Sequence, residues 1–158
     1  MIFVIVGSQK FPFDRLIREM DRLKAANVIT EQVFAQIGAS TYIPQHLIWK
    51  RYLDKEEFDA QIDASDILIT HAGEGSIMTG LLKHKKVIAV PRYKNLGEHV
   101  SDHQLEIARA LAKQKCIVNV EDITQLESAI CHINEFDLQP YESGNDSILQ
   151  LLCDFIGE

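Results

Sequence analysis

The apolar residues of this chain gather in short unbroken runs that are separated by longer stretches of mixed polarity. Runs of this kind, rich in Ile and Val, are typical of strands buried on both faces of a parallel sheet. We therefore predict six strands, of which the third comes from a more mixed segment. They span residues 2–6, 33–37, 47–53, 67–69, 87–90 and 116–120.

Between these runs, apolar residues recur at intervals of three and four, which is the spacing of one face of an α-helix. The clearest example runs from Phe13 to Leu23, where charged residues fill most of the other positions. Ser101 and Asp122 are candidate N-caps for two later helices. Helices are predicted over residues 13–23, 55–64, 77–82, 102–113, 122–130 and 148–156.

Strands and helices thus alternate along the chain. This order predicts an α/β fold, a three-layer doubly wound parallel sheet of about six strands that is Rossmann-like. Right-handed crossovers place the loops 7–12, 70–76 and 91–103 at one edge of the sheet. The first and fourth strands flank the point where strand order reverses, so we expect the turns at Gly7 and Gly73 to face each other.

The composition and net charge of the chain exclude several classes of function. A length of 158 residues suits a single domain, residues 1–158, and no apolar run is long enough to cross a bilayer. Residues 1–7 are too short and lack the basic residues of a signal peptide, so we expect a cytoplasmic protein. A net charge of −7 argues against nucleic acid and against direct docking on an anionic membrane. Cys116, Cys131 and Cys153 are expected to be buried free thiols, without a zinc site or disulfide.

A glycine-rich turn, residues 70–76 (THAGEGS), lies between the fourth strand and a helix. Such a turn leaves backbone N–H groups free at a helix N-terminus, where the dipole favours an anion such as phosphate. Gly73 and Gly75 let the backbone approach a ligand, although glycine can also serve only to make the corner. The first turn, at Gly7-Ser8-Gln9, has the same two interpretations. The G-x-G-x-x-G fingerprint is absent, which argues against a dinucleotide cofactor.

Two side chains of this turn remain ambiguous. His71 either has its ring pinned by a backbone carbonyl or donates to a phosphate and polarises a leaving group. Glu74 would repel a diphosphate, so its side chain either points away to solvent or reaches a sugar hydroxyl.

Asp102, His103 and Gln104 stand in a row at the start of a helix. Carboxylate and amide side chains suit the vicinal hydroxyls of a sugar, although helix capping by Ser101 and Asp102 would use the same residues. A metal site formed by His99, Asp102 and His103 is a third interpretation, but no further ligand is evident and we expect no metal.

Residues 71–76 (HAGEGS), 86–92 (KVIAVPR) and 102–108 (DHQLEIA) form a series of short motifs. Together they resemble the C-terminal-domain family of family 28 glycosyltransferases, whose pattern is H-A-G-x-G-S/T, then a Lys followed by I-x-V-P-R, then D-x-Q-x-E-x-A. The likeness is strongest to small stand-alone members from the eukaryotic dolichol pathway and from bacterial exopolysaccharide synthesis. It covers about the first 120 residues.

The resemblance implies one half of a GT-B fold, in an inverting transferase that uses a UDP-sugar as substrate and needs no metal or other cofactor. Many relatives carry a Glu three residues after the motif Ser, where this chain has Thr79. Three interpretations stay open: Thr79 makes a weaker contact with the ribose, Glu74 makes that contact in its place, or the nucleotide binds at a shifted position. The implied donor contacts are Gly7, Ser8, Gly73, Gly75 and Ser76 for the diphosphate, Asp102 and Gln104 for the sugar hydroxyls, and Tyr52 and Leu53 near the uracil.

A GT-B site lies between two domains, and we expect only one domain here. The resemblance therefore implies a membrane-anchored partner subunit that binds a polyprenyl-linked acceptor and supplies the catalytic base, so that this chain reaches the inner face of the membrane only through its partner. His71 would have at most a minor catalytic role. Two alternatives stay open, a non-catalytic subunit that stabilises a separate transferase, suggested by Glu74 and Thr79, and a nucleotide-binding enzyme that works alone.

Overall fold

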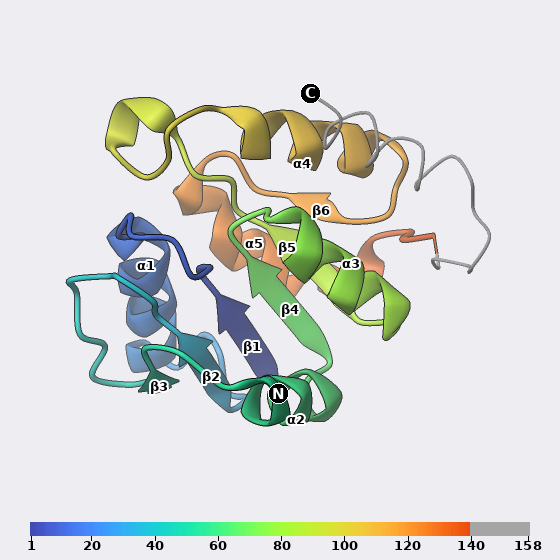
Figure 1. Cartoon of the computed structure of the whole chain (residues 1–158). Helices are drawn as coiled ribbons and strands as arrows, with labels where there is room; N and C mark the ends of the chain where they lie inside the picture. The colour runs from blue at the N-terminus through green and yellow to red at the C-terminus, as the bar shows by residue number, and fades with distance from the viewer. Residues whose placement is uncertain (140–158) are drawn as a thin grey trace.

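Six parallel strands form one sheet in the computed structural model, which describes residues 1–139 (Figure 1). The strand order is β3-β2-β1-β4-β5-β6, and each neighbouring pair is parallel. The predicted doubly wound sheet is therefore confirmed, and its order reverses between β1 and β4. The strands are β1 (Ile2–Ile5), β2 (Val33–Gln36), β3 (Ile48–Lys50), β4 (Ile67–Thr70), β5 (Lys86–Ala89) and β6 (Val118–Asn119).

Helices cover both faces of this sheet, because each strand directs alternate side chains to opposite faces. Ile2 and Val4 of β1 pack into one core with α1 and α5, whereas Phe3 and Ile5 pack into a second core with α2, α3 and α4. Continuous apolar runs therefore identified the central strands correctly. The helices are α1 (Asp14–Ala25), α2 (Lys55–Ala64), α3 (Glu74–Leu82), α4 (His103–Lys113) and α5 (Leu126–Cys131), with 3-10 turns η1 (Lys94–Leu96), η2 (Ile123–Gln125) and η3 (Ile133–Glu135).

The strand register brings the carboxyl ends of the central strands level with one another. Ile5 of β1 pairs with Thr70 of β4, and Thr70 pairs in turn with Ala89 of β5. The segments that follow these residues consequently leave the sheet at the same edge. They are the turns predicted to carry the ligand-binding groups.

The predicted element boundaries differ from the structure mainly at the two edges of the sheet. β3 and β6 contain three and two residues, fewer than predicted, because each pairs with only one neighbouring strand among residues 1–139. Asp102 takes the N-cap position of α4 in place of Ser101, although the Ser101 hydroxyl accepts from the N–H of His103 (3.3 Å). Asp122 does cap its segment, but that segment begins as η2 before continuing as α5.

The cysteine prediction is half correct for the described residues. Cys116 is a buried free thiol, as expected, whereas Cys131 is free but exposed. Cys131 ends α5, beyond the residues of that helix that pack on the sheet. Cys153 and the helix predicted over residues 148–156 lie outside the described residues. Within residues 1–139, no helix has both the length and the apolar character that crossing a membrane requires.

Candidate functional site

The turns after β1 and β4 form the walls of a cleft of ≈ 380 Å³. The cleft lies outside the carboxyl ends of the two strands between which strand order reverses, which is where open α/β sheets bind ligands. The predicted meeting of the Gly7 and Gly73 turns is therefore confirmed. The cleft is lined by Gly7, Ser8, Gln9, His71, Ala72, Gly73, Glu74, Gly75, Ser76, His99, His103, Gln104 and Ile107.

The ring of His71 fills the space between the two turns. A Cβ atom on Gly7 would come within 2.8 Å of His71 Nε2, and a Cβ atom on Gly73 within 2.4 Å of the same atom. Both positions therefore require glycine because of this ring. At Gly73, contact with the ring explains the glycine more directly than close approach of a ligand to the backbone does. Gly75 differs, since no described atom lies within 4 Å of the Cβ that it would carry.

His71 is neutral and its orientation is fixed. Its Nδ1 lies 3.3 Å from the carbonyl oxygen of Ile5 and 3.3 Å from the hydroxyl of Thr70. A carbonyl only accepts, so the ring proton lies on Nδ1 and Nε2 carries a lone pair. Burial, with the positive charge of Arg92 as a second cause, lowers the pKa of His71 to about 3. The ring is thus pinned by a backbone carbonyl, and its Nε2 is not a donor to a phosphate in this state.

The N-terminus of α3 gives the cleft its capacity to bind an anion. α3 follows Gly73, which has no side chain to cap the first-turn N–H groups. The amides of this turn have no acceptor within the helix, and the helix dipole favours a negative charge beside them. Ala72 has a φ of 68°, a left-handed conformation that is uncommon for a residue with a Cβ, and it turns the chain from β4 toward α3.

A carboxylate also lies in the cleft. Glu74 Oε1 is 3.2 Å from His103 Nε2, so the first residue of α3 contacts the first residue of α4. The two side chains are 33% and 31% exposed, respectively. Glu74 therefore points toward His103 and not away from the cleft. A diphosphate that entered would have to displace this carboxylate or lie beside it.

Gln104 lines the cleft and has an unsatisfied polar atom that is buried. Its side chain is buried, and its Oε1 has no hydrogen-bond partner among the described residues. A buried amide oxygen without a donor costs about 1–3 kcal/mol, so this atom is suited to a ligand hydroxyl or N–H. The neighbouring Asp102 is turned elsewhere, since its Oδ1 accepts the N–H of Lys94 at 3.0 Å and it does not line the cleft.

Three other residues predicted for the site lie outside the cleft. Thr79 Oγ1 donates to the carbonyl of Gly75 at 2.8 Å, within α3. Tyr52 and Leu53 follow β3, which is separated from β1 by β2. A ligand that reached them from the cleft would have to extend across the carboxyl ends of β1 and β2.

Four lining residues were not among the predicted site residues: Gln9, Ala72, His99 and Ile107. Gln9 adjoins the predicted Ser8, and Ile107 lies three residues after Gln104, on the same side of α4. His99 stacks loosely on Phe11, with ring centroids 6.2 Å apart. Within residues 1–139, no group of three or more His, Cys, Asp or Glu side chains could hold a metal ion, so the geometry does not support the metal interpretation of His99.

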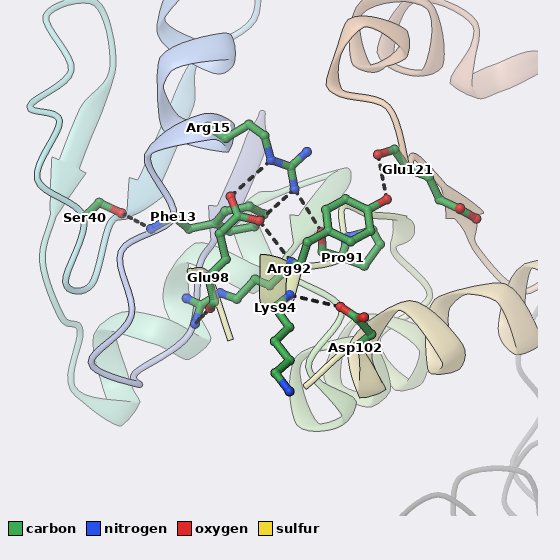
Figure 2. Close-up of polar contacts among 10 residues, drawn as sticks. Phe13, Arg15, Ser40, Pro91, Arg92, Lys94, Glu98, Asp102 and Glu121 are labelled. Carbon is green, nitrogen blue, oxygen red and sulfur yellow. Dashed lines mark hydrogen bonds and ion pairs between the residues drawn. The ribbon is translucent and has the colours of Figure 1, made fainter. Parts of the chain in front are cut away.

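The segment between β5 and α4 is held by an ion pair between the buried Glu98 and the partly exposed Arg15 (Figure 2). Arg15 of α1 donates through Nε and Nη2 to the carboxylate of Glu98, at 3.1 and 3.0 Å. The same Nη2 donates to the carbonyl of Pro91 (3.0 Å), and Glu98 Oε1 accepts the N–H of Tyr93 (3.1 Å). This two-point geometry fixes the direction of both side chains. It ties the segment that leads from β5 toward α4 to helix α1.

A larger groove of ≈ 600 Å³ lies along α4 and the edge strand β6. Its charged lining residues include Arg109 and Glu121, which pair with each other at 2.6 Å. The groove is remote from the reversal of strand order between β1 and β4. Its position outside the strand ends where strand order reverses therefore favours the smaller cleft as the functional site.

A family model and several known proteins match most of this chain. The family model described as glycosyltransferase family 28 C-terminal domain matches residues 1–154 of the chain. UDP-N-acetylglucosamine transferase subunit ALG13 of Homo sapiens is 32% identical over a 122-residue alignment, which covers 72% of this chain and 10% of that protein. The chain thus spans about a tenth of the length of the curated relatives that it matches.

Two solved structures show the shared fold. The solution structure of ALG13 matches with a TM-score of 0.68 and 19% identity, over 99% of this chain and 96% of that one. The crystal structure of MurG from Acinetobacter baumannii matches with a TM-score of 0.55 and 15% identity, over 83% of this chain and 40% of that one.

Proposed function

Because the chain belongs to the glycosyltransferase family 28 C-terminal domain family, we propose that it is the donor-binding, catalytic subunit of a two-component inverting glycosyltransferase. In this proposal it transfers a sugar from a UDP-sugar to a polyprenyl-linked acceptor in polysaccharide synthesis. The observation that carries the proposal is the unpartnered, buried Oε1 of Gln104 in a cleft where α3 presents its uncapped N-terminus. A sugar diphosphate supplies both missing partners, hydroxyl donors and a negative charge.

The donor would be held without a metal ion. The amides around Gly75 and Ser76, with the Ser8 hydroxyl across the cleft, would bind the diphosphate. Gly7 and Gly73 would contribute by backbone alone, because the His71 ring excludes a Cβ at both positions.

The sugar, the uracil and the ribose of the donor would contact residues beyond those that bind the diphosphate. Asp102 would reach a sugar hydroxyl only by giving up its bond to Lys94, whereas Gln104 is already in place. His103 and Glu74 would meet the donor at the cleft. Tyr52 and Leu53 would contact the uracil of a nucleotide that extends toward β3, and Thr79 would lie near the ribose.

The reaction would depend on stabilising the leaving group. As the bond to the anomeric carbon breaks, charge grows on the departing UDP, and preorganised amides at a helix N-terminus stabilise that charge. A base is still needed to deprotonate the acceptor hydroxyl. His71 is a poor candidate, since its pKa of about 3 leaves it little affinity for a proton at neutral pH. We assign the base to the partner subunit.

The partner in this proposal is a membrane-anchored subunit that binds the lipid-linked acceptor. The human relative is itself described as a subunit of a transferase, which supports an activity shared between two chains. This chain would then act on the cytoplasmic side, at the membrane only through its partner.

The proposal is tested by calorimetric titration of UDP and a panel of UDP-sugars, without added metal, into the wild type and Gly75→Asp. Open space at Gly75 lets the variant fold, while its new carboxylate lies where the diphosphate would bind. We expect saturable binding by the wild type and loss of binding in the variant. The tightest sugar identifies the donor.

Gln32→Asp is the matched control, because Gln32 is exposed and precedes β2 at the opposite end of the sheet. It adds the same charge and should bind UDP as the wild type does. A folded wild type that binds no uridine nucleotide would contradict the proposal.

Glu74 supports one alternative, a non-catalytic subunit that stabilises or enhances a separate transferase. Its carboxylate lies in the cleft beside His103 and opposes a diphosphate. Titration in the presence of the partner distinguishes the two functions. Binding of UDP by the complex, lost in Gly75→Asp, favours the donor-binding subunit.

A further inference from the structure

Arg92 is a buried cation that lies behind the cleft, between the turn after β1 and the segment that follows β5. The side chain is 1% exposed and follows β5 in the chain. Its Nη2 donates to the carbonyl of Val6, and its Nη1 donates to the carbonyl of Glu98 at 3.5 Å. Val6 directly precedes Gly7, and Glu98 directly precedes His99, both of which line the cleft. The guanidinium therefore lies one residue behind two segments that line the cleft, the turn after β1 and the segment between β5 and α4.

Among residues 1–139, this cation has no carboxylate of its own. Figure 2 shows Arg15 and Arg92 on either side of Glu98, whose carboxylate is bonded to Arg15 and to a backbone N–H. Arg92 bonds only to carbonyl groups, rests on the ring of Phe13 at 5.4 Å, and has no partner for its Nε among the described residues. Two guanidinium charges thus face one carboxylate, which leaves one positive charge in excess.

The excess positive charge affects groups that line the cleft. The pKa of Arg92 is lowered by burial to about 10, so the group stays protonated at neutral pH. Its charge also helps to depress the pKa of His71, a lining residue. Within a protein, a charge is screened far less than at the surface and acts over several ångströms.

We propose that Arg92 is an affinity determinant for the diphosphate of the donor, which acts from behind the cleft through its charge and without touching the ligand. The inference rests on the proposed function. It follows from the position of the guanidinium behind two segments that line the cleft, and from the lack of a carboxylate paired with Arg92 among the described residues. A bound diphosphate supplies that counter-charge.

The test is titration of UDP, UMP and uridine into Arg92→Met, Arg92→Lys and the wild type. We expect Arg92→Met to weaken UDP binding by about tenfold or more, UMP less, and uridine hardly at all, because the effect scales with ligand charge. Arg92→Lys should retain most of the UDP affinity. Arg109→Met is the control, since it removes the same charge from an exposed pair and should leave UDP affinity unchanged.

Glu98→Gln provides a test of opposite sign. It removes the single negative charge of the cluster and should raise UDP affinity, whereas a purely structural role of this cluster would lower it. Equal UDP affinity in Arg92→Met and wild type, or an equal loss for uridine, overturns the inference and leaves the proposed function standing. If Arg92→Met does not fold, an unchanged or lower UDP affinity in Glu98→Gln overturns it. A folded wild type that binds no UDP overturns both.

Discussion

At the scale of single residues, one imidazole ring determines which glycines of the cleft are needed for the fold. Gly7 and Gly73 belong to separate turns, yet both are constrained by the same Nε2 of His71. Gly75, two residues further on, is unconstrained by any described side chain. The two glycines of one short motif therefore have separate roles, the first in packing and the second at the open face.

We predict that Gly73→Ala lowers the free energy of unfolding by about 1–3 kcal/mol, because the new methyl group would overlap the His71 ring. Gly75→Ala is the matched control and should be neutral or slightly stabilising, since alanine favours a helix and meets open space. Urea denaturation of both variants measures the difference. Equal stability of the two would contradict the contact with His71.

His71 also makes stability depend on pH. In the unfolded chain the imidazole takes up a proton near its ordinary pKa of 6.5, whereas burial delays this to about 3 in the folded protein. Between these values the unfolded state binds more protons, so the free energy of unfolding falls as the pH is lowered. Urea midpoints across this window should fall less steeply in His71→Asn than in the wild type. Parallel profiles would show that another group governs the decline.

At the scale of elements, the segment between β5 and α4 is a rigid support for the cleft. Its fixed points are the pair of Arg15 with Glu98, the bond from Tyr93 Oη to the carbonyl of Glu121 (2.8 Å), and the bond from Lys94 N–H to Asp102 (3.0 Å). Each bond joins the segment to a different element or closes it on itself. The first turn of α4, with Gln104, is consequently held in place before any ligand binds.

We predict that Arg15→Met lowers the free energy of unfolding by about 3 kcal/mol, because it leaves the Glu98 carboxylate buried without its main partner. Arg22→Met, on the same helix, removes an exposed pair with Glu19 and should leave the free energy of unfolding nearly unchanged. Denaturant unfolding compares them. The double variant Arg15→Met with Glu98→Gln should recover part of the loss, and failure to recover any would argue against the pair as the cause.

Elements were predictable from the sequence where burial follows a period. β1 and α1 were found because a continuous apolar run and a three-to-four spacing directly reflect burial. β3 and β6 were overextended, since apolar residues near the sheet edges continue beyond the paired segment. The exposure of Cys131 depends on where α5 ends, which no local pattern specified.

The sequence predicted where the site lies in the sheet, because that follows from the strand order, but it did not predict how the side chains pack there. The facing of the Gly7 and Gly73 turns followed from strand order, and Gln104 followed from a motif. The packing of His71 against both turns involves residues far apart in the chain. Burial of Arg92 contradicts the ordinary preference of arginine for the surface, so no sequence pattern indicated it.

At the scale of the whole molecule, the net charge of −7 makes the positive cluster behind the cleft a local exception. An anionic ligand should therefore bind to the folded protein alone, since only folding assembles the cluster and the α3 terminus. UDP at about one hundred times its dissociation constant should raise the free energy of unfolding by about 2.7 kcal/mol. EDTA should leave this stabilisation unchanged, and loss of it on chelation would contradict a metal-free site. Thermal unfolding with and without each reagent is the measurement.

The central place of β1 has a consequence for synthesis of the chain. Ile2 pairs with Val33 on one side and with Ile67 on the other, so β1, which is made before β4, waits for β4 before its second edge is closed. Until then a wholly apolar strand has an open edge, the feature on which aggregation begins. Closing that edge also brings Gly7 to Gly73 and creates the cleft. In the proposed function, a nucleotide would therefore find no site until β4 has joined β1, and the ligand could not stabilise the chain before then.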